Sequence, residues 1–490
     1  MHTPSRRGDP HAPVLVGVGT ASSSAPAIEL MTQASREAAS NAGAPSLLRA
    51  VDRIAVPQGS WSLSNPARLV ASRIGADEAL TYLCQIGVSQ QEVIDDALDA
   101  IASGQAEVVL VVGGEARAFA RLGGVEVDDD PGDPPDVTLT RPPDFMAPIE
   151  AAAGSLWPVV QQYALIENAL AAHEHQERAA HTADIARLWA RFNDVAQSND
   201  LAAFPTARSA GDIVRPDIKN RPLAYPYNRW HASQWTVDQA AALLFCSTER
   251  ARAAGVPTDR WVFPHVALHA SHAITLTARR DLHAWPAMAV LGRAAAARLG
   301  APLADLPIAE VYSCFPAAVR VQQRSLGLPL DGTPTVTGGM TFAGGPFNNY
   351  VLQSMAAVIG LLRARPGEQG LVTTVSGMLS KPGLAVWSAT PWPNGDRYLT
   401  GDLAEEASTA TATVPVATVQ SARGPATVAS FTVTYDPGDP LRPDRTVVVA
   451  EMGDGSQTVA ACQDETLARY ALGGSLIGQT VHLEGAMFTP

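Results

Sequence analysis

The sequence predicts an α/β fold that is built from two copies of one strand–helix unit and ends in a small β-rich domain. Residues 51–115 and residues 309–378 share one order of features: an apolar strand, a helix closed by Leu-Gly or Ile-Gly, a Gly-led turn into a second helix, and a buried strand ending near glycines. Strands that alternate with helices form a largely parallel sheet with helices packed on it. The two Gly-led turns should take equivalent positions, so we expect a pocket between the halves, lined by residues 87–91 and 344–350.

The composition argues against several classes of protein. With 490 residues, of which 46% are hydrophobic and 17% are charged, the chain can bury more than one core, and about 150 residues per domain predicts about three domains. The net charge of -13 disfavours nucleic acid or an anionic membrane as a partner. No segment has the run of about eighteen apolar residues that a membrane span requires, and the N-terminus lacks a signal-peptide core. We therefore expect a cytoplasmic protein.

Neither a disulfide framework nor a metal site is predicted. The four cysteines are Cys84, Cys246, Cys314 and Cys462. They are widely spaced and form no CxxC pair, which argues against both kinds of site. His231, His269 and His272 lie near expected strand ends without the spacing of metal ligands, so we interpret them as structural or surface residues.

The first half of the fold should occupy residues 13–118 together with residues 235–255. Its expected strands lie in residues 14–23, 51–58 and 106–114, and its expected helices in residues 25–43, 65–75 and 89–104. The helices have apolar residues at helical spacing, and Asn-Ala-Gly closes the first of them. Gly17 and Gly19 resemble part of a dinucleotide-binding fingerprint, but the third glycine and the acidic partner are missing, so no such site is predicted.

Residues 119–234 are expected to form a helical and loop insertion. The stretch 125–145 is acidic and rich in proline, which indicates a surface loop. Helices are predicted in residues 155–175 and 181–199 from apolar residues at i, i+3 and i+4, and residues 219–247 return to a buried strand. Such an insertion over a sheet is a usual place for a substrate lid.

The second half of the fold should occupy residues 256–400, after which the composition changes. Residues 411–490 predict a small β-barrel or OB-like domain, because short strands are separated by Gly, Asp and Pro turns. Its expected strands lie in residues 413–423, 426–436, 445–453 and 479–488, with one short helix near 465–473. We expect this domain to dock on the core or to cover the mouth of the pocket.

Over residues 13–400 the chain resembles the thiolase superfamily, a resemblance carried by motifs in matching order. They are GVG, IASGQAEVVLVVGGE, VDQAAALLF, EVYSCF, GGMTFAGGPFNN and GLVTTVSG. The resemblance implies a duplicated thiolase fold with five αβαβα layers. EVYSCF is similar to the His-Asp-Cys-Phe loop of sterol-carrier-protein type thiolases, and thiolase-like proteins with an added C-terminal domain match the whole layout.

The resemblance also implies that the family's reactive side chains are replaced. Thiolases use a nucleophilic cysteine before the first-half helix, a histidine in a Gly-His-Pro turn, a second cysteine in a Cys-x-Gly turn, and an Asn or His that helps to hold an oxyanion. The matching positions here are Gly87, Gly345, the turn Val375-Ser376-Gly377, and Tyr312. A glycine can neither carry an acyl group nor polarise a carbonyl through a side chain.

Cys314 is the one family cysteine that remains, at the cysteine position of the His-Asp-Cys-Phe loop, where the family's residue is proposed to act in proton transfer. The alternative is that Cys314 is a small buried residue between Ser313 and Phe315. We interpret Cys84 and Cys246 as packing residues.

Polar residues of the two turns could line the same pocket. They are Ser89, Gln90, Gln91, Asn348 and Asn349, with Ser376 from the third turn, and Gly344 lines the pocket beside them. Backbone N–H groups at such helix starts suit a carbonyl or a phosphate. The alternative is that the Ser and Asn side chains only cap helices and that Ser376 only completes a turn.

Three functions follow from this comparison. The first is a thiolase-like protein related to acetyl-CoA acetyltransferases that binds an acyl-CoA or similar thioester without classical thiolase catalysis; CoA thioester is then substrate or ligand, and no cofactor is tightly bound. The second is an acyltransferase or carbon–carbon bond enzyme with altered chemistry that uses Cys314. The third is a non-catalytic subunit of a thiolase-type complex. Thiolases usually pair through the sheet of the first half, so a homodimer is a further expectation.

Overall fold

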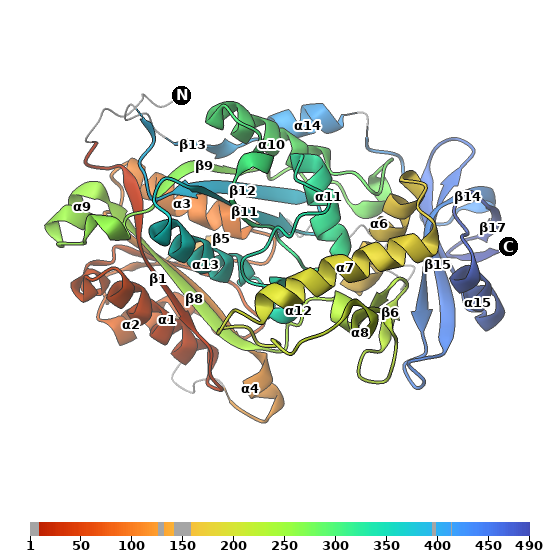
Figure 1. Cartoon of the computed structure of the whole chain (residues 1–490), viewed down its shortest axis with the longest axis horizontal. Coiled ribbons are helices and arrows are strands. Elements are labelled where there is room, and N and C mark those ends of the chain that lie inside the picture. Colours follow the sequence, from red (N-terminus) through yellow and green to blue (C-terminus); the bar gives the residue numbers. More distant parts are fainter. Residues whose placement is uncertain (1–8, 126–131, 142–157, 394–397, 413) are drawn as a thin grey trace.

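The computed structural model describes residues 9–125, 132–141, 158–393, 398–412 and 414–490 (Figure 1). Parts of the predicted loop at 125–145 and the start of the helix predicted at 155–175 lie outside the described residues. None of the helices in the described residues combines the length and the hydropathy that a membrane span requires. The same residues contain no group of three or more His, Cys, Asp or Glu side chains placed to hold a metal ion.

The first sheet has six strands in the order β1-β8-β4-β2-β3-β5. They are β1 (Pro13–Ala21), β2 (Arg53–Pro57), β3 (Leu80–Cys84), β4 (Val108–Ala116), β5 (Val137–Leu139) and β8 (Asp238–Ser247). The sheet is mixed, because β8 runs antiparallel to both β1 and β4 while the other pairings are parallel. β3 and β5 were not expected: β3 is only partly buried and gives no apolar run, and β5 lies in the stretch predicted to be loop.

The second sheet has the order β10-β11-β12-β9-β13. Its strands are β9 (Phe263–His269), β10 (Ile308–Glu310), β11 (Gln369–Ser376), β12 (Lys381–Ser388) and β13 (Leu399–Asp402). The run β2-β4-β8-β1 of the first sheet recurs as β10-β11-β12-β9, with the same parallel and antiparallel pairings. The predicted duplication is therefore confirmed at the level of strand order and direction.

Helices and sheets stack in five layers. The helices of the two halves are α1 (Ala27–Asn41), α2 (Pro66–Ile74), α3 (Gln90–Ala102), α10 (Pro286–Leu299), α11 (Pro316–Leu326) and α13 (Tyr350–Ala364). α1 and α2 cover the outer face of the first sheet, α3 and α13 lie between the sheets, and α10 covers the outer face of the second. In β4, Leu110 faces the outer helices and Val111 faces the central ones, so the strand is apolar on both sides.

Shorter elements complete the core and the insertion. The helices are α4 (Arg117–Arg121), α6 (Val159–His173), α7 (Arg178–Ala196), α8 (Ala210–Val214), α9 (Thr248–Ala253), α12 (Gly339–Phe342) and α14 (Ala404–Thr411), and short strands are β6 (Pro222–Ala224) and β7 (Tyr227–Asn228). The 3₁₀ helices are Pro45–Ala50, Arg229–His231, Thr258–Arg260, Leu276–Ala278 and Leu303–Asp305. The long insertion helices α6 and α7 match the two that the sequence predicts, and both pack against α11.

The C-terminal residues form a closed five-stranded barrel. Its elements are β14 (Arg423–Tyr435), β15 (Pro443–Met452), β16 (Gln457–Cys462), α15 (Glu465–Gly473), β17 (Thr480–Glu484) and β18 (Met487–Thr489). The barrel closes because β14 pairs with both β17 and β15, at the two ends of the run β15-β16-β18-β17. The predicted β-barrel is confirmed, while its likeness to OB modules stays a prediction. The barrel docks on the insertion, where α6 packs on β14 and Ala224 pairs with Thr434.

Three details of the C-terminal prediction were wrong. The described residues of 413–423 form isolated bridges at Pro415 and Thr418 instead of a regular strand. Residues 479–488 do not form one strand but contribute to the hairpin of β17 and β18, because Gly485 takes a positive φ of 67° between them. The strand β16 was not expected.

Candidate functional site

Three turns from distant parts of the sequence meet at one place in the core. They precede α3, precede α13, and connect β11 to β12. Gln58 joins the first two turns: its Oε1 accepts a hydrogen bond from Ile86 N at 3.3 Å, and its backbone oxygen accepts one from Asn348 Nδ2 at 3.0 Å. Lys381 adds the third, since its Nζ donates to the Gly87 carbonyl at 2.6 Å. The structure thus brings together the two Gly-led turns that the repeat pattern paired.

The turn before α3 depends on glycine. Gly87 has a φ of 110°, a conformation that residues with a Cβ rarely adopt. Two residues later, Ser89 Oγ accepts a hydrogen bond from Glu92 N at 3.2 Å and caps the helix. The capping interpretation of Ser89 therefore describes its contact, and no side chain stands at position 87 to act as a nucleophile.

Lys381 was missed by sequence reasoning. It is the first residue of β12, and only 5% of its surface is exposed. Burial of an ammonium group is costly unless it is hydrogen-bonded, so a buried lysine at the junction of two turns is informative. The sequence does hold a signal: Lys381 and Lys219 are the two lysines of the chain, and Lys381 interrupts an apolar run just after the Val-Ser-Gly turn.

Two polar side chains lie where side chains of Gly344 and Gly345, the glycine pair before α13, would begin. A Cβ on Gly345 would lie 1.9 Å from Ser233 Oγ, and a Cβ on Gly344 would lie 2.4 Å from Gln239 Oε1. Gly344 also has a φ of 104°, which itself favours glycine. Gln239 is held by hydrogen bonds from its Nε2 to the carbonyls of Ala343, at 2.9 Å, and Leu201. The position where the resemblance expects an imidazole is thus filled by the Ser233 hydroxyl, which the sequence reasoning also missed.

The loop of Tyr312, Ser313 and Cys314 lies against the same turn. Ser313 is fully buried, and its Oγ accepts a hydrogen bond from Met340 N at 3.0 Å. Tyr312 N donates to Thr373 Oγ1 at 2.9 Å, and burial raises the pKa of its phenol. These contacts place the loop firmly beside α12 and β11, but they use Ser313 as a structural acceptor.

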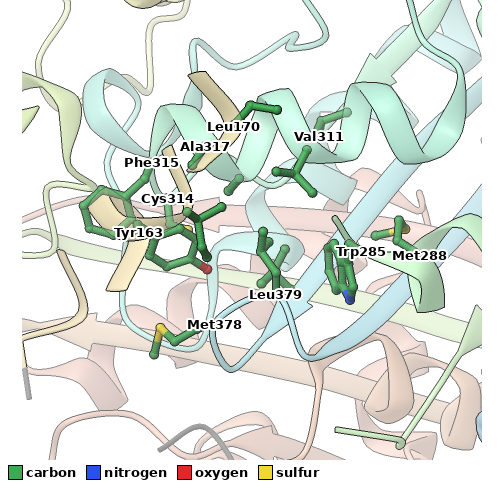
Figure 2. Close-up of a cluster of buried hydrophobic side chains, with 14 of the residues drawn as sticks. Tyr163, Leu170, Trp285, Met288, Val311, Cys314, Phe315, Ala317, Met378 and Leu379 are labelled. Carbon is green, nitrogen blue, oxygen red and sulfur yellow. The ribbon is translucent and has the colours of Figure 1, made fainter. Parts of the chain in front are cut away.

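Cys314 lies in an apolar cluster, with 9% of its surface exposed. Figure 2 shows its side chain among the rings of Tyr163 and Phe315 and near Met378 and Leu379. Burial raises the pKa of Cys314 to about 12, although a hydrogen bond with Tyr163 lowers it in part. A thiol in this setting is not a ready nucleophile near neutral pH. Cys314 stays a candidate, with geometry that favours its interpretation as a packing residue.

The turn between β11 and β12 is closed by its own residues. Ser376 contributes its carbonyl, which accepts a hydrogen bond from Ser380 Oγ at 3.2 Å, and Gly377 has a φ of 68°. Met378 and Leu379 follow and are buried in the cluster that contains Cys314. Ser376 therefore completes a turn, as the alternative interpretation proposed, and large apolar side chains occupy the space behind it.

The two asparagines before α13 differ. Asn348 has a φ of 52° and uses its side-chain amide to reach Gln58. Asn349 is buried, and both atoms of its side-chain amide lack a hydrogen-bond partner among the described residues. Asn349 packs closely over Gly113, where a Cβ would lie 2.4 Å from Asn349 Oδ1. An unsatisfied buried amide is rare in native proteins, so a water or a ligand group is expected beside it.

The histidines do not gather with Cys314. His231 is buried and accepts a hydrogen bond from Asn228 N at 3.0 Å through Nδ1; burial lowers its pKa to about 4. His269 is the last residue of β9 in the second sheet, and its Nδ1 pairs with Asp95 of α3. Within the described residues, no hydrogen bond joins a cysteine to a histidine.

Comparison with solved structures supports a thiolase-like fold. No family model and no curated protein matches the chain. Among solved structures, a monomeric SCP2-thiolase-like protein type 1 from Mycobacterium smegmatis is 28% identical, with a TM-score of 0.83 over 98% of this chain and 99% of that one. An Ltp2–ChsH2(DUF35) aldolase is 20% identical, with a TM-score of 0.58 over 78% of this chain and 98% of that one. The dimeric peroxisomal thiolase of Saccharomyces cerevisiae is 15% identical, with a TM-score of 0.55 over 77% of this chain and 97% of that one.

Proposed function

Because the chain has a thiolase fold and resembles SCP2-thiolase-like proteins, we propose that it binds an acyl-CoA or similar thioester and does not perform classical thiolase catalysis. The binding site lies where the three turns meet, at Gly87, Gly345 and Lys381. Acyl transfer needs an activated nucleophile, and thiolysis needs a group that polarises the carbonyl and moves a proton. The turns supply hydrogen-bond donors but no thiolate and no imidazole.

The observation that carries this proposal is that the Ser233 hydroxyl lies where a side chain at position 345 would begin. Ser233 Oγ fills the space that a side chain at this position would need. A hydroxyl can donate a hydrogen bond to a carbonyl, but no base of the described chain is hydrogen-bonded to this one to take its proton. The arrangement therefore suits recognition of a thioester and gives no route to an acyl-enzyme.

The test uses the purified full-length chain and two measurements. Isothermal titration calorimetry with CoA and acetyl-CoA should show saturable binding. A thiolysis assay with acetoacetyl-CoA and CoA should show no turnover above the protein-free rate. Turnover comparable to that of an active thiolase measured alongside would contradict the proposal, and so would the absence of binding to every CoA derivative tried.

An enzyme with altered chemistry is the second candidate, and one observation favours it. Tyr163 lies beside Cys314, and the interaction between the two side chains acts on the pKa of both. Iodoacetamide separates the two functions: a working Cys314 should be alkylated in the native protein and protected by CoA esters. We expect the opposite, because burial raises the pKa of Cys314 to about 12; labelling should follow unfolding only.

A non-catalytic subunit of a larger complex is the third candidate. The aldolase structure pairs Ltp2 with a second protein, whereas the M. smegmatis relative is described as monomeric. We favour a monomer, because β5 of the same chain already pairs with the side of β3 that would otherwise be the edge of the sheet.

Four free cysteines fit a reducing compartment, which supports a cytoplasmic location.

A further inference from the structure

The Ser233 hydroxyl stands in a position prepared by other residues. Ser233 belongs to the segment that leads from the insertion into β8. Its Oγ lies 1.9 Å from the point where a Cβ on Gly345 would be, and the next nearest atoms to that point are Met340 O at 3.2 Å and Met340 Cβ at 3.3 Å. The Oγ atom therefore occupies a space that glycine leaves open.

The backbone around Ser233 is fixed from three sides. Ser233 N donates to the Cys314 carbonyl at 2.9 Å, and Gln234 N donates to the Met340 carbonyl at 3.1 Å. Gly345 N in turn donates to the Gln234 carbonyl at 3.0 Å. With the backbone held in this way, the Ser233 hydroxyl can move only by rotation about the bonds of its own side chain. It is preorganised, which lowers the entropic cost of holding a ligand.

The hydroxyl of Ser233 makes no hydrogen bond with any residue that the structure describes, and the side chain is only partly buried. The neighbouring Gln239 shows the same feature in a deeper setting. Its Oε1, beside Gly344, is buried and has no partner among the described residues, although the residue as a whole is only 6% exposed. Gly344 and Gly345 thus leave space for two polar atoms, Gln239 Oε1 and Ser233 Oγ, that make no hydrogen bond with the described residues. Unused polar atoms in a rigid setting point to a bound molecule or water.

We infer that Ser233 is a ligand-binding residue whose hydroxyl donates a hydrogen bond to the carbonyl oxygen of the thioester. This inference rests on the proposed function and names the group that would recognise the reacting carbonyl. Among the residues that the structure describes, no histidine or carboxylate is hydrogen-bonded to the Ser233 hydroxyl, so it binds the carbonyl without forming a covalent bond. The site then distinguishes a thioester from a thiol or a thioether by one neutral hydrogen bond.

The experiment compares two probes on the full chain: acetyl-CoA, which has the carbonyl, and S-ethyl-CoA, a thioether that lacks it. In Ser233→Ala, the affinity for acetyl-CoA should fall by about five- to tenfold, which is the effect of one hydrogen bond. The affinity for S-ethyl-CoA should stay unchanged. Ser198→Ala, a substitution of an exposed serine at the end of α7, is the matched control and should change neither affinity.

A second variant tests the same space from the other side. Gly345→Ala should force the Ser233 Oγ to rotate away and so reproduce the loss for acetyl-CoA, and adding Ser233→Ala should cause no further loss. Equal losses for both probes, or no loss for acetyl-CoA in either variant, would overturn the role of Ser233 while leaving the proposed function intact. If the wild-type chain binds neither probe, the proposed function fails and this inference fails with it.

Discussion

The imidazole of His269 is held by Asp95, whose Oδ2 lies 2.6 Å from His269 Nδ1. Asp95 belongs to α3 of the first half and His269 ends β9 of the second, so the pair joins the two halves. The other carboxyl oxygen of Asp95 accepts a hydrogen bond from Gln91 Nε2 at 2.7 Å, and Asp402 Oδ2 lies 3.8 Å from His269 Nε2. A ring between two carboxylates is stabilised in its charged form.

Loss of this pair should destabilise the protein most strongly at mildly acidic pH. Burial alone would lower the pKa of His269, but the hydrogen bond with Asp95 and the nearby charges of Asp95, Asp402 and Glu92 raise it. A raised folded-state pKa means that the stabilisation is fully present below about pH 6.5 and is lost as the pH rises through the folded value. His269→Gln should therefore cost about 3 kcal/mol at pH 6, and the gap to wild type should narrow at higher pH. Urea unfolding of both proteins across pH 6–9 measures this difference in the free energy of unfolding. His272→Gln is the control and should show no such pH dependence.

The buried Glu167 should make the fold sensitive to strong acid. Its Oε1 lies 3.2 Å from Arg320 Nη1, and Tyr227 OH donates to its Oε2 at 2.6 Å. Burial would raise the pKa of Glu167, but Arg320 and His181 outweigh it and lower the pKa to about 2. This stabilisation is present above pH 4.5 and is lost as the pH falls towards 2.

Glu167→Gln should therefore cost about 3 kcal/mol near pH 7, because the buried Arg320 guanidinium loses its nearer carboxylate and keeps only Glu174, at 3.5 Å. The difference from wild type should shrink as the pH falls from about 5 to 2. Thermal unfolding followed by circular dichroism at several pH values measures this. Glu405→Gln, at an exposed position of α14, should behave like wild type throughout. A variant gap that is independent of pH would contradict the assignment.

Lys381 should support both the fold and ligand binding. Lys381→Met removes the donor to the Gly87 carbonyl and should lower the free energy of unfolding by about 1–3 kcal/mol. Because the Gly87 turn loses a contact with the second half, acyl-CoA affinity should also fall. Lys219→Met removes the only other lysine, which is exposed, and should change neither quantity. Chemical denaturation and calorimetry on both variants decide the point.

The short strand β5 should keep the chain monomeric. Asp136, just before β5, accepts hydrogen bonds from Thr81 N at 2.8 Å and Thr81 Oγ1 at 2.7 Å, and pairs with Arg68 at 3.1 Å. Asp136→Ala should loosen β5 and expose the edge of β3, which can then pair with another chain. Sedimentation analysis should show wild type at its monomer mass of 51.4 kDa and concentration-dependent association of the variant. Asp133→Ala, a nearby exposed carboxylate, is the control; an unchanged Asp136→Ala would contradict this role of β5.

Several features of the fold could be read from the sequence because they depend on local order. The alternation of apolar strands with Gly-closed helices gave the duplication, and β2-β4-β8-β1 and β10-β11-β12-β9 repeat it in space. The strands that were missed, β3, β5 and β16, are short or only partly apolar, and their pairing partners are what make them strands. The glycines at positions 87 and 345 were also visible in the sequence, as parts of turns that the repeat places in matching positions.

The chain by itself determined the repeat, the glycine turns and the absence of a thiol at position 87, because each is written in neighbouring residues. Only the tertiary structure decided which side chains lie beside the glycines at positions 87 and 345. Ser233 reaches Gly345, Lys381 reaches Gly87, and His269 reaches Asp95 across long separations in sequence. No local pattern encodes such pairs, since a polar side chain finds its partner only when two sheets and their helices have packed.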